Sequence, residues 1–136
     1  MKKLLFVLFF ILSANVSIAE VEINFTKDAF ESAQKSGKTV VVNSWNKWCY
    51  TCSKQEKIIK EAKKDFKDVL FLSYEQKNKD FAEYLNIDHR STIVIYKNNN
   101  EIARAIGITK KEEIYSFINF AVFSGLTVFH DRPERA

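Results

Sequence analysis

Two cysteines are the residues of this chain best able to do chemistry. Cys49 and Cys52 are its only cysteines, and they stand three positions apart in the run WCYTC. A thiolate of such a pair can attack another disulfide and exchange the bond reversibly. The run follows a buried strand predicted over 39–45 (TVVVNSW) and precedes a helical pattern that reaches to about Phe66. The spacing therefore places both sulfurs where a strand leads into a helix N-terminus.

The predicted helix makes the two sulfurs unequal. At about 100° per residue, Cys52 lies over the core-facing stripe, which also contains Ile59 and Ala62, whereas Cys49 lies at the margin of that stripe on the first residue of the helix. Free N–H groups and the helix dipole stabilise a thiolate at this end and so lower the pKa of Cys49. We therefore predict an outer, attacking Cys49 and a sheltered, resolving Cys52, with no cofactor and no metal needed for the exchange.

Two other interpretations of the pair are a structural disulfide and half of a zinc site. Closing a four-residue loop contributes under about 2 kcal/mol in the chain-entropy model, so the disulfide would stabilise the fold little. His89 and His130 do not fall at zinc-ligand spacing, and there is no further cysteine. Redox exchange is the interpretation that we favour.

The rest of the chain reads as strands and helices in alternation. Helices between strands predict a largely parallel sheet covered on both faces, and the turn signal Asn98-Asn99-Asn100 predicts a closing hairpin that adds an antiparallel edge strand. The fold class is therefore α/β. We expect strands at 21–25, 39–45, 69–74, 92–96 and 101–106, and helices after Thr26, after Cys49, over 79–85 and along the stripe Ile114, Phe117, Ile118 and Ala121.

Composition narrows the function classes. The 136 residues suffice for one domain, and 46% hydrophobic and 28% charged residues with three glycines and one proline exclude collagen-like and wholly disordered chains. A formal net charge of only +4 gives no support to nucleic-acid binding.

The first residues read as an export signal. Lys2 and Lys3 are followed by an apolar run over 4–12, and Ser17-Ile18-Ala19 offers small residues at a cleavage site. The run is about half of the roughly 20 residues that a membrane-spanning helix needs. We therefore expect a signal peptide over 1–19 and a mature domain over 20–136, with 125–136 as a C-terminal tail and no stable membrane insertion.

The chain resembles the thioredoxin superfamily, specifically the exported thioredoxin-like proteins of bacteria, over roughly residues 22–124. The resemblance rests on VVVNSWNKWCYTC before a helix, on STIVIYKNNNEIARAIG ending in Gly107, and on the last amphipathic helix. It implies a thioredoxin-like fold with a central mixed β-sheet flanked by helices on both faces. It also implies that Cys49 attacks and Cys52 resolves, with protein thiols and disulfides as partners. In bacteria with two membranes the location is the periplasm, and a membrane thiol relay is the expected electron donor or acceptor.

The sequence departs from the family pattern in the loop that faces the dithiol. Ser91 stands where the family has a cis-proline, and the only proline in the chain is Pro133. A cis bond before serine would cost about 3 kcal/mol, so we expect a trans loop of different shape and an altered mode of substrate docking. The Ser91 hydroxyl can donate to the Cys49 thiolate in such a loop, or it can form an ordinary loop hydrogen bond.

A second departure is Asn43, which stands where many thioredoxins have a buried acid that accepts the proton of the resolving cysteine. Asparagine cannot accept that proton, so we expect a slower reductase or one adapted to a particular partner.

Four residues around the cysteines are candidates for substrate binding, namely Trp48, Tyr50, Arg90 and Ser91. Arg90 can stabilise the thiolate or receive an acidic partner, or it can simply be a solvated loop charge. Farther away, Phe120 and Phe123 lie beyond the apolar stripe of the last helix, and we expect the segment 126–129 to cover them, the alternative being an interface.

The function that these observations favour is an exported thiol-disulfide oxidoreductase that acts on protein partners. One alternative is a binding module of the same fold with little redox activity. The other is a dimer that holds a metal ion or an iron-sulfur cluster through the same cysteines.

Overall fold

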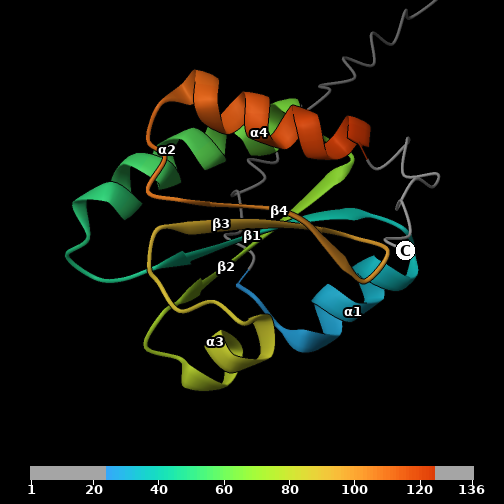
Figure 1. The fold of residues 1–136 in the computed structure, drawn as a ribbon, viewed down its shortest axis with the longest axis horizontal. Helices are drawn as coiled ribbons and strands as arrows, with labels where there is room; N and C mark the ends of the chain where they lie inside the picture. The colour runs from blue at the N-terminus through green and yellow to red at the C-terminus, as the bar shows by residue number, and fades with distance from the viewer. Residues whose placement is uncertain (1–23, 125–136) are drawn as a thin grey trace, which may run out of the picture.

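The computed structural model describes residues 24–124, which form one four-stranded sheet with two helices on each face (Figure 1). The strands lie in the order β2-β1-β3-β4. The elements in chain order are α1 (Lys27–Lys35), β1 (Thr39–Trp45), α2 (Tyr50–Asp65), β2 (Val69–Glu75), α3 (Lys79–Leu85), β3 (Thr92–Lys97), β4 (Asn100–Ile106) and α4 (Lys111–Ser124).

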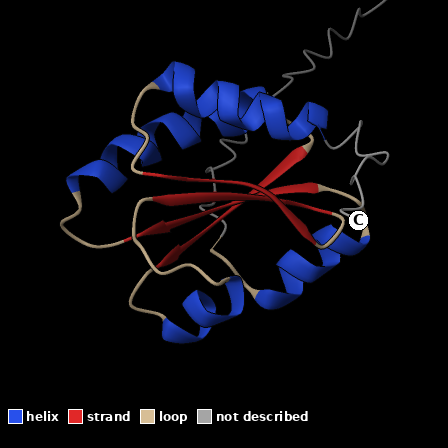
Figure 2. Cartoon of the chain, viewed as in Figure 1, coloured by secondary structure: helices blue, strands red, loops and turns tan. Residues whose placement is uncertain are grey.

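The sheet separates two apolar layers because alternate side chains of each strand point to opposite faces. Val40 and Val42 of β1 pack in one layer with α1 and α3, and Val41 packs in the other layer with α2 and α4. Figure 2 shows the same arrangement, with one pair of helices above the strands and the other pair below. As an interior strand, β1 is buried on both faces, which explains its β-branched residues over 39–42.

The sheet is mixed, as the family resemblance implied, and the expectation of a largely parallel sheet is wrong. Only β1 and β2 are parallel, whereas β3 runs antiparallel to β1 and to β4 within the described residues. The connection from β2 to β3 has the seven-residue α3 as its only helix, and β3 begins beside β1 at the end of the sheet where β2 stopped. The loop before β3 consequently lies beside the residues that follow β1.

The capping and turn residues predicted from the sequence lie at the ends of helices and strands in the structure. Thr26 caps α1 by accepting a hydrogen bond from the Ala29 N–H at 3.1 Å. Asn98 and Asn99 adopt positive φ values of 51° and 62° in the turn between β3 and β4. The strand expected over 21–25 is described only in its last two residues, where Asn24 forms a single parallel bridge to Ser73.

Several expectations lie outside the described residues. They concern the signal peptide over 1–19, the tail over 125–136 and the covering of Phe120 and Phe123 by residues 126–129. Between residues 24 and 124, no helix has both the length and the apolar character needed to cross a membrane.

Candidate active site

Cys49 and Cys52 are joined by a disulfide at the N-terminus of α2. Cys49 is the N-cap residue of this helix, and its Sγ accepts a hydrogen bond from the Cys52 N–H at 3.2 Å. A sulfur in this position takes the role that a serine or aspartate oxygen has in an ordinary N-cap. The helix therefore aims one of its free backbone donors at Cys49, which is the electrostatic basis for a stabilised thiolate there.

The two sulfurs differ less in exposure than the helical pattern predicted. Cys49 is 8% exposed and Cys52 is 5% exposed, so both cysteines are buried residues. The prediction placed Cys49 at the margin of the helix stripe but did not include the loop before β3, which covers both sulfurs. Their inequality lies mainly in their hydrogen bonds, because the backbone donor of Cys52 reaches Cys49.

Ser91 is the loop residue that touches the disulfide. Its Oγ lies 3.3 Å from Cys49 Sγ and 3.1 Å from Cys52 Sγ. The described peptide bonds contain no cis bond, and Ser91 has a positive φ of 59°, so the loop is trans as expected from the absence of proline. Ser91 is itself buried, which places it against the sulfurs rather than on an open binding surface.

Two buried polar residues that the sequence analysis did not single out hold the Ser91 loop. The Ser44 hydroxyl donates to the His89 carbonyl at 2.7 Å, and the Ser44 carbonyl accepts from the Ser91 N–H at 2.9 Å. Gln55 Nε2 donates to the carbonyls of Ser91 at 3.0 Å and of Ile108 at 2.9 Å. The signal for Gln55 was a polar residue within the core-facing stripe of α2, where an unpaired amide would be costly.

The surface beside the disulfide is aromatic and basic. Trp48 is 93% exposed and Tyr50 is 75% exposed. The Lys47 ammonium lies 5.5 Å from the centre of the Trp48 ring, and that of Lys54 lies 4.7 Å from the centre of the Tyr50 ring. Trp48 also has a positive φ of 65°, an outlier for a bulky residue that turns its ring outward before the helix. These rings are available to a partner molecule.

Arg90 and His89 are exposed in the loop before β3. Together with Ser91, Asn46 and Thr51 they line a groove that continues to Gly107. Of the four predicted substrate-binding residues, the structure thus places Trp48 and Tyr50 on one rim, Arg90 in the groove, and Ser91 beneath them against the sulfurs.

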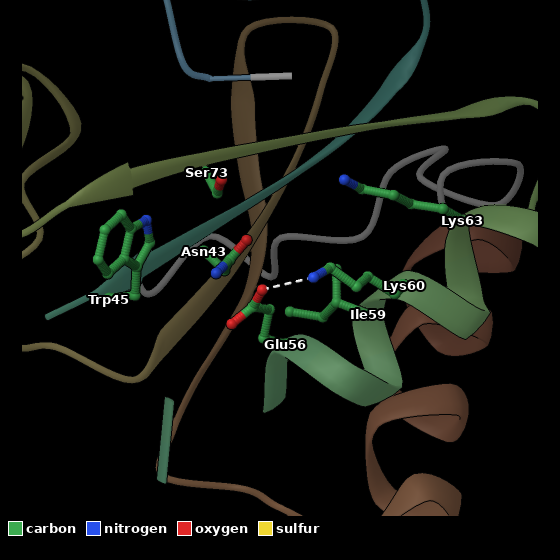
Figure 3. A pocket seen from close by; sticks show the side chains of 7 residues that line it. All are labelled: Asn43, Trp45, Glu56, Ile59, Lys60, Lys63 and Ser73. Atoms are coloured by element: carbon green, nitrogen blue, oxygen red, sulfur yellow. Dashed lines mark hydrogen bonds and ion pairs between the residues drawn. The ribbon is translucent and has the colours of Figure 1, made fainter. Parts of the chain in front are cut away.

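A separate cavity of about 120 Å³ lies between α2 and the paired strands β1 and β2 (Figure 3). Asn43 lies in its wall where the family has an acid, and the Ser73 hydroxyl is buried there without a hydrogen-bond partner among the described residues. Glu56 and Lys60 form an ion pair of 2.6 Å beside Asn43. The strand side of the cavity therefore offers an amide and a hydroxyl but no proton acceptor of carboxylate type. The cavity is lined by Asn43, Trp45, Glu56, Ile59, Lys60, Lys63 and Ser73.

The described part of the chain contains no group of three or more histidine, cysteine, aspartate or glutamate side chains that can hold a metal ion. The chemistry that this geometry supports directly is exchange at the Cys49–Cys52 disulfide.

Comparison with known proteins agrees with this geometry. The thioredoxin family profile matches residues 21–120. A thioredoxin of Mycoplasma genitalium is 32% identical over 83 residues, which cover 60% of this chain and 81% of that protein. A thioredoxin of Rickettsia prowazekii is 29% identical over 103 residues, covering 73% of this chain and 97% of that protein. The crystal structure of Trxlp from Edwardsiella tarda matches with a TM-score of 0.66 and 26% identity, covering 69% of this chain and 94% of that one. The chain therefore belongs to the thioredoxin family and is a thiol-disulfide oxidoreductase with its Cys-x-x-Cys pair at Cys49 and Cys52.

Proposed function

We propose that this protein is an exported, periplasmic oxidoreductase that exchanges disulfides with other proteins, and that Cys49 is its attacking thiol. The observation that carries the proposal is the position of Cys49 at the N-cap of α2, where the Cys52 N–H donates to its sulfur. A backbone donor aimed at a sulfur favours the thiolate, which is the nucleophile in thiol-disulfide exchange.

In the reducing direction, the Cys49 thiolate attacks one sulfur of a partner disulfide, and the partner's other sulfur leaves as a thiolate. Cys52 then loses its proton and attacks Cys49 Sγ. The partner leaves with both sulfurs reduced, and the protein keeps the Cys49–Cys52 disulfide. The same steps run backwards oxidise a partner dithiol.

The rim of the site supports a protein as the partner. Trp48 and Tyr50 present two large exposed rings beside the disulfide, and aromatic residues of this kind are typical anchors in protein interfaces. The Lys47 and Lys54 ammonium groups lie over these rings, and Arg90 is exposed in the groove, which favours a partner segment carrying acidic residues near its cysteine.

Export is proposed from the first residues of the sequence. Lys2 and Lys3, the apolar run and the small residues before position 20 have the pattern of a cleaved signal. An exported oxidoreductase needs an external source or sink of electrons. We propose a membrane thiol relay for this role, because the sequence contains no flavin or nucleotide motif.

The experiment is a trap in the intact cell. Replacing the resolving thiol by Cys52→Ser leaves a mixed disulfide unresolved, so covalent partner adducts should accumulate through Cys49 in the periplasmic fraction. Cys49→Ser is the matched control and should give no adducts. Insulin reduction by the wild-type protein supplies an independent measure of activity.

The absence of adducts together with the absence of insulin reduction would contradict the proposal and favour a binding module. Stoichiometric metal or an iron-sulfur chromophore in a dimer of the purified protein would favour the metal alternative. Adducts found only in the cytoplasm would contradict export while leaving the exchange chemistry intact.

A further inference from the structure

The Ser91 hydroxyl is placed between the two reacting sulfurs. Its Oγ lies within hydrogen-bond distance of both, at 3.3 Å from Cys49 Sγ and 3.1 Å from Cys52 Sγ. A sulfur in a disulfide carries no proton, so the hydroxyl is the only possible donor in these contacts. Ser91 is 5% exposed, and little water competes for this hydrogen bond.

The two sulfurs depend on this donor to different degrees. Cys49 Sγ also accepts the N–H of Cys52 at 3.2 Å. In the described part of the chain, Cys52 Sγ has Ser91 as its hydrogen-bond partner and no backbone donor. Negative charge that develops on Cys52 would therefore be stabilised by the Ser91 hydroxyl.

The backbone holds Ser91 firmly in an unfavourable conformation. Its N–H donates to the Ser44 carbonyl at 2.9 Å, and its carbonyl accepts from the Gly107 N–H at 2.9 Å and from Gln55 Nε2 at 3.0 Å. Its φ of 59° lies in the left-handed region, which glycine and asparagine adopt at lower cost than serine. Strain of this kind persists where the surrounding structure enforces it, and it clusters at functional sites.

We propose that Ser91 is a further catalytic residue, a single hydrogen-bond donor that stabilises first the Cys52 thiolate and then the Cys49 thiolate during one exchange. This inference rests on the proposed exchange at Cys49 and Cys52. It assigns to Ser91 a role in the chemical step, beyond the substrate contact expected from its place in the loop.

In the oxidising direction, a partner thiolate attacks Cys49 Sγ, a bond forms between the partner sulfur and Cys49, and the Cys49–Cys52 bond breaks. Cys52 leaves as a thiolate that accepts the Ser91 hydrogen bond. Cys52 next takes the proton of the partner's second thiol, whose thiolate attacks the partner sulfur of the mixed disulfide and releases Cys49 as a thiolate.

Two electrons have then passed from the partner to the protein, and the partner leaves as a disulfide. In the product, Cys52 carries a proton and Cys49 does not. The Ser91 hydroxyl turns to donate to the Cys49 thiolate, and its oxygen accepts from the Cys52 thiol. One hydroxyl therefore serves both charged states without moving its backbone.

The test compares two variants that lack the hydroxyl. Ser91→Ala keeps the backbone strain, whereas Ser91→Gly relieves it. We expect both to slow reduction of the disulfide by dithiothreitol roughly tenfold, and both to raise the pKa of Cys49 in the reduced protein by about one unit, the size typical of a hydrogen bond to a charged group. The pKa is read from the pH dependence of iodoacetamide alkylation at Cys49.

Thr92→Val is the matched control. Its hydroxyl donates to the His89 carbonyl at 2.7 Å in the same loop, whereas the hydroxyl that lies against both sulfurs is that of Ser91, so the substitution disturbs the loop without removing the proposed donor. We expect wild-type values for both quantities. Thermal unfolding of each oxidised variant verifies that the fold is intact.

Wild-type rates and an unchanged Cys49 pKa in both Ser91 variants would overturn the inference, and so would an equal loss in Thr92→Val. Slower reduction by dithiothreitol in Ser91→Ala together with a wild-type rate in Ser91→Gly would also overturn the inference. Both variants lack the hydroxyl, so the slower rate would then come from backbone strain. These results are independent of the trapping experiment, because dithiothreitol tests the chemical step without a protein partner. Loss of the adducts in the cell would count against the proposed function alone.

Discussion

Trp48 is the single side chain that the site offers most openly to a partner. It is exposed next to Cys49 in the chain, and the Lys47 ammonium lies over its ring. We expect Trp48→Ala to slow insulin reduction roughly tenfold, because an aromatic anchor in an interface is typically worth this much. Reduction of the disulfide by dithiothreitol should stay within about twofold, since a small thiol does not need the anchor.

Phe120→Ala is the matched control for Trp48→Ala. Phe120 is 63% exposed on α4 and does not line the groove beside the disulfide. Its replacement should leave insulin reduction unchanged. Equal losses in the two variants, or a normal insulin rate in Trp48→Ala, would contradict the assignment of Trp48 as a partner contact.

Asn43 is a second residue with a testable effect on the reaction. It lines the cavity at the position where many thioredoxins have an acid, and an amide cannot accept a proton there. We expect Asn43→Asp to speed insulin reduction roughly tenfold by providing a general base, at the lower end of what such a group contributes. Asn43→Ala should give no gain, and an Asn43→Asp rate at or below that of the wild type would refute the expectation.

The same substitution has a consequence for stability. Burial raises the pKa of the new carboxyl above its unfolded value. At acid pH the carboxyl is neutral in both the folded and the unfolded state, so its ionisation does not lower the free energy of unfolding of Asn43→Asp. The loss of stability grows as pH rises through the unfolded pKa. Urea unfolding at acid and neutral pH measures this difference directly.

At the scale of elements, Arg104 links β4 to the C-terminal end of α3 by hydrogen bonds. Its guanidinium donates to both carboxylate oxygens of Glu101 at 2.8 Å and to the Asn86 carbonyl at 2.8 Å. The hydrogen bonds from Arg104 lower the pKa of Glu101, although partial burial opposes this shift. Because the folded pKa is lower than the unfolded one, the pair stabilises the protein above the ordinary glutamate pKa and stops doing so as pH falls through the folded value.

Glu101→Gln should therefore reduce the free energy of unfolding by about 0.5 kcal/mol at neutral pH, a small effect because the carboxylate is partly exposed. The difference should vanish at pH values below the folded pKa of Glu101. Urea unfolding at the two pH values checks this. If Glu101→Gln still lowers the free energy of unfolding at acid pH, the account is contradicted.

The elements themselves were largely predictable from sequence because their signals are local. The run over 39–45 was predicted as a strand buried on both faces, and the structure confirms it as β1, an interior strand with the same bounds. The helix over 79–85 likewise matches α3. Strand direction was not predictable from this periodicity, because it depends on the end of the sheet at which the chain re-enters. The alternation of strands and helices therefore predicted a parallel β3, whereas β3 is antiparallel to β1.

The site was predictable to the extent that it is local. The spacing of Cys49 and Cys52 places both sulfurs at a helix N-terminus in any fold that keeps the strand and the helix. The contact of Ser91 with both sulfurs depends on a loop 39 residues farther along the chain than Cys52, and on the buried Ser44 and Gln55 that hold it. No local pattern encodes such distant pairings.

At the scale of the whole molecule, the mixed sheet is what assembles the site. β1 ends and the antiparallel β3 begins at the same end of the sheet, so the helix N-terminus with its disulfide meets the Ser91 loop there. Apolar layers cover both faces of the sheet, while the Trp48 and Tyr50 rings beside the disulfide remain exposed. The fold thus creates two chemically different sulfurs from two identical residues.

The most direct test of this account is a titration of both thiols in the reduced, full-length protein, with alkylation at each cysteine quantified by mass spectrometry across the pH range. We predict that Cys49 titrates well below the ordinary thiol pKa of about 8.5 and that Cys52 titrates above Cys49. Equal pKa values, or a lower value for Cys52, would contradict the assignment of Cys49 as the attacking thiol.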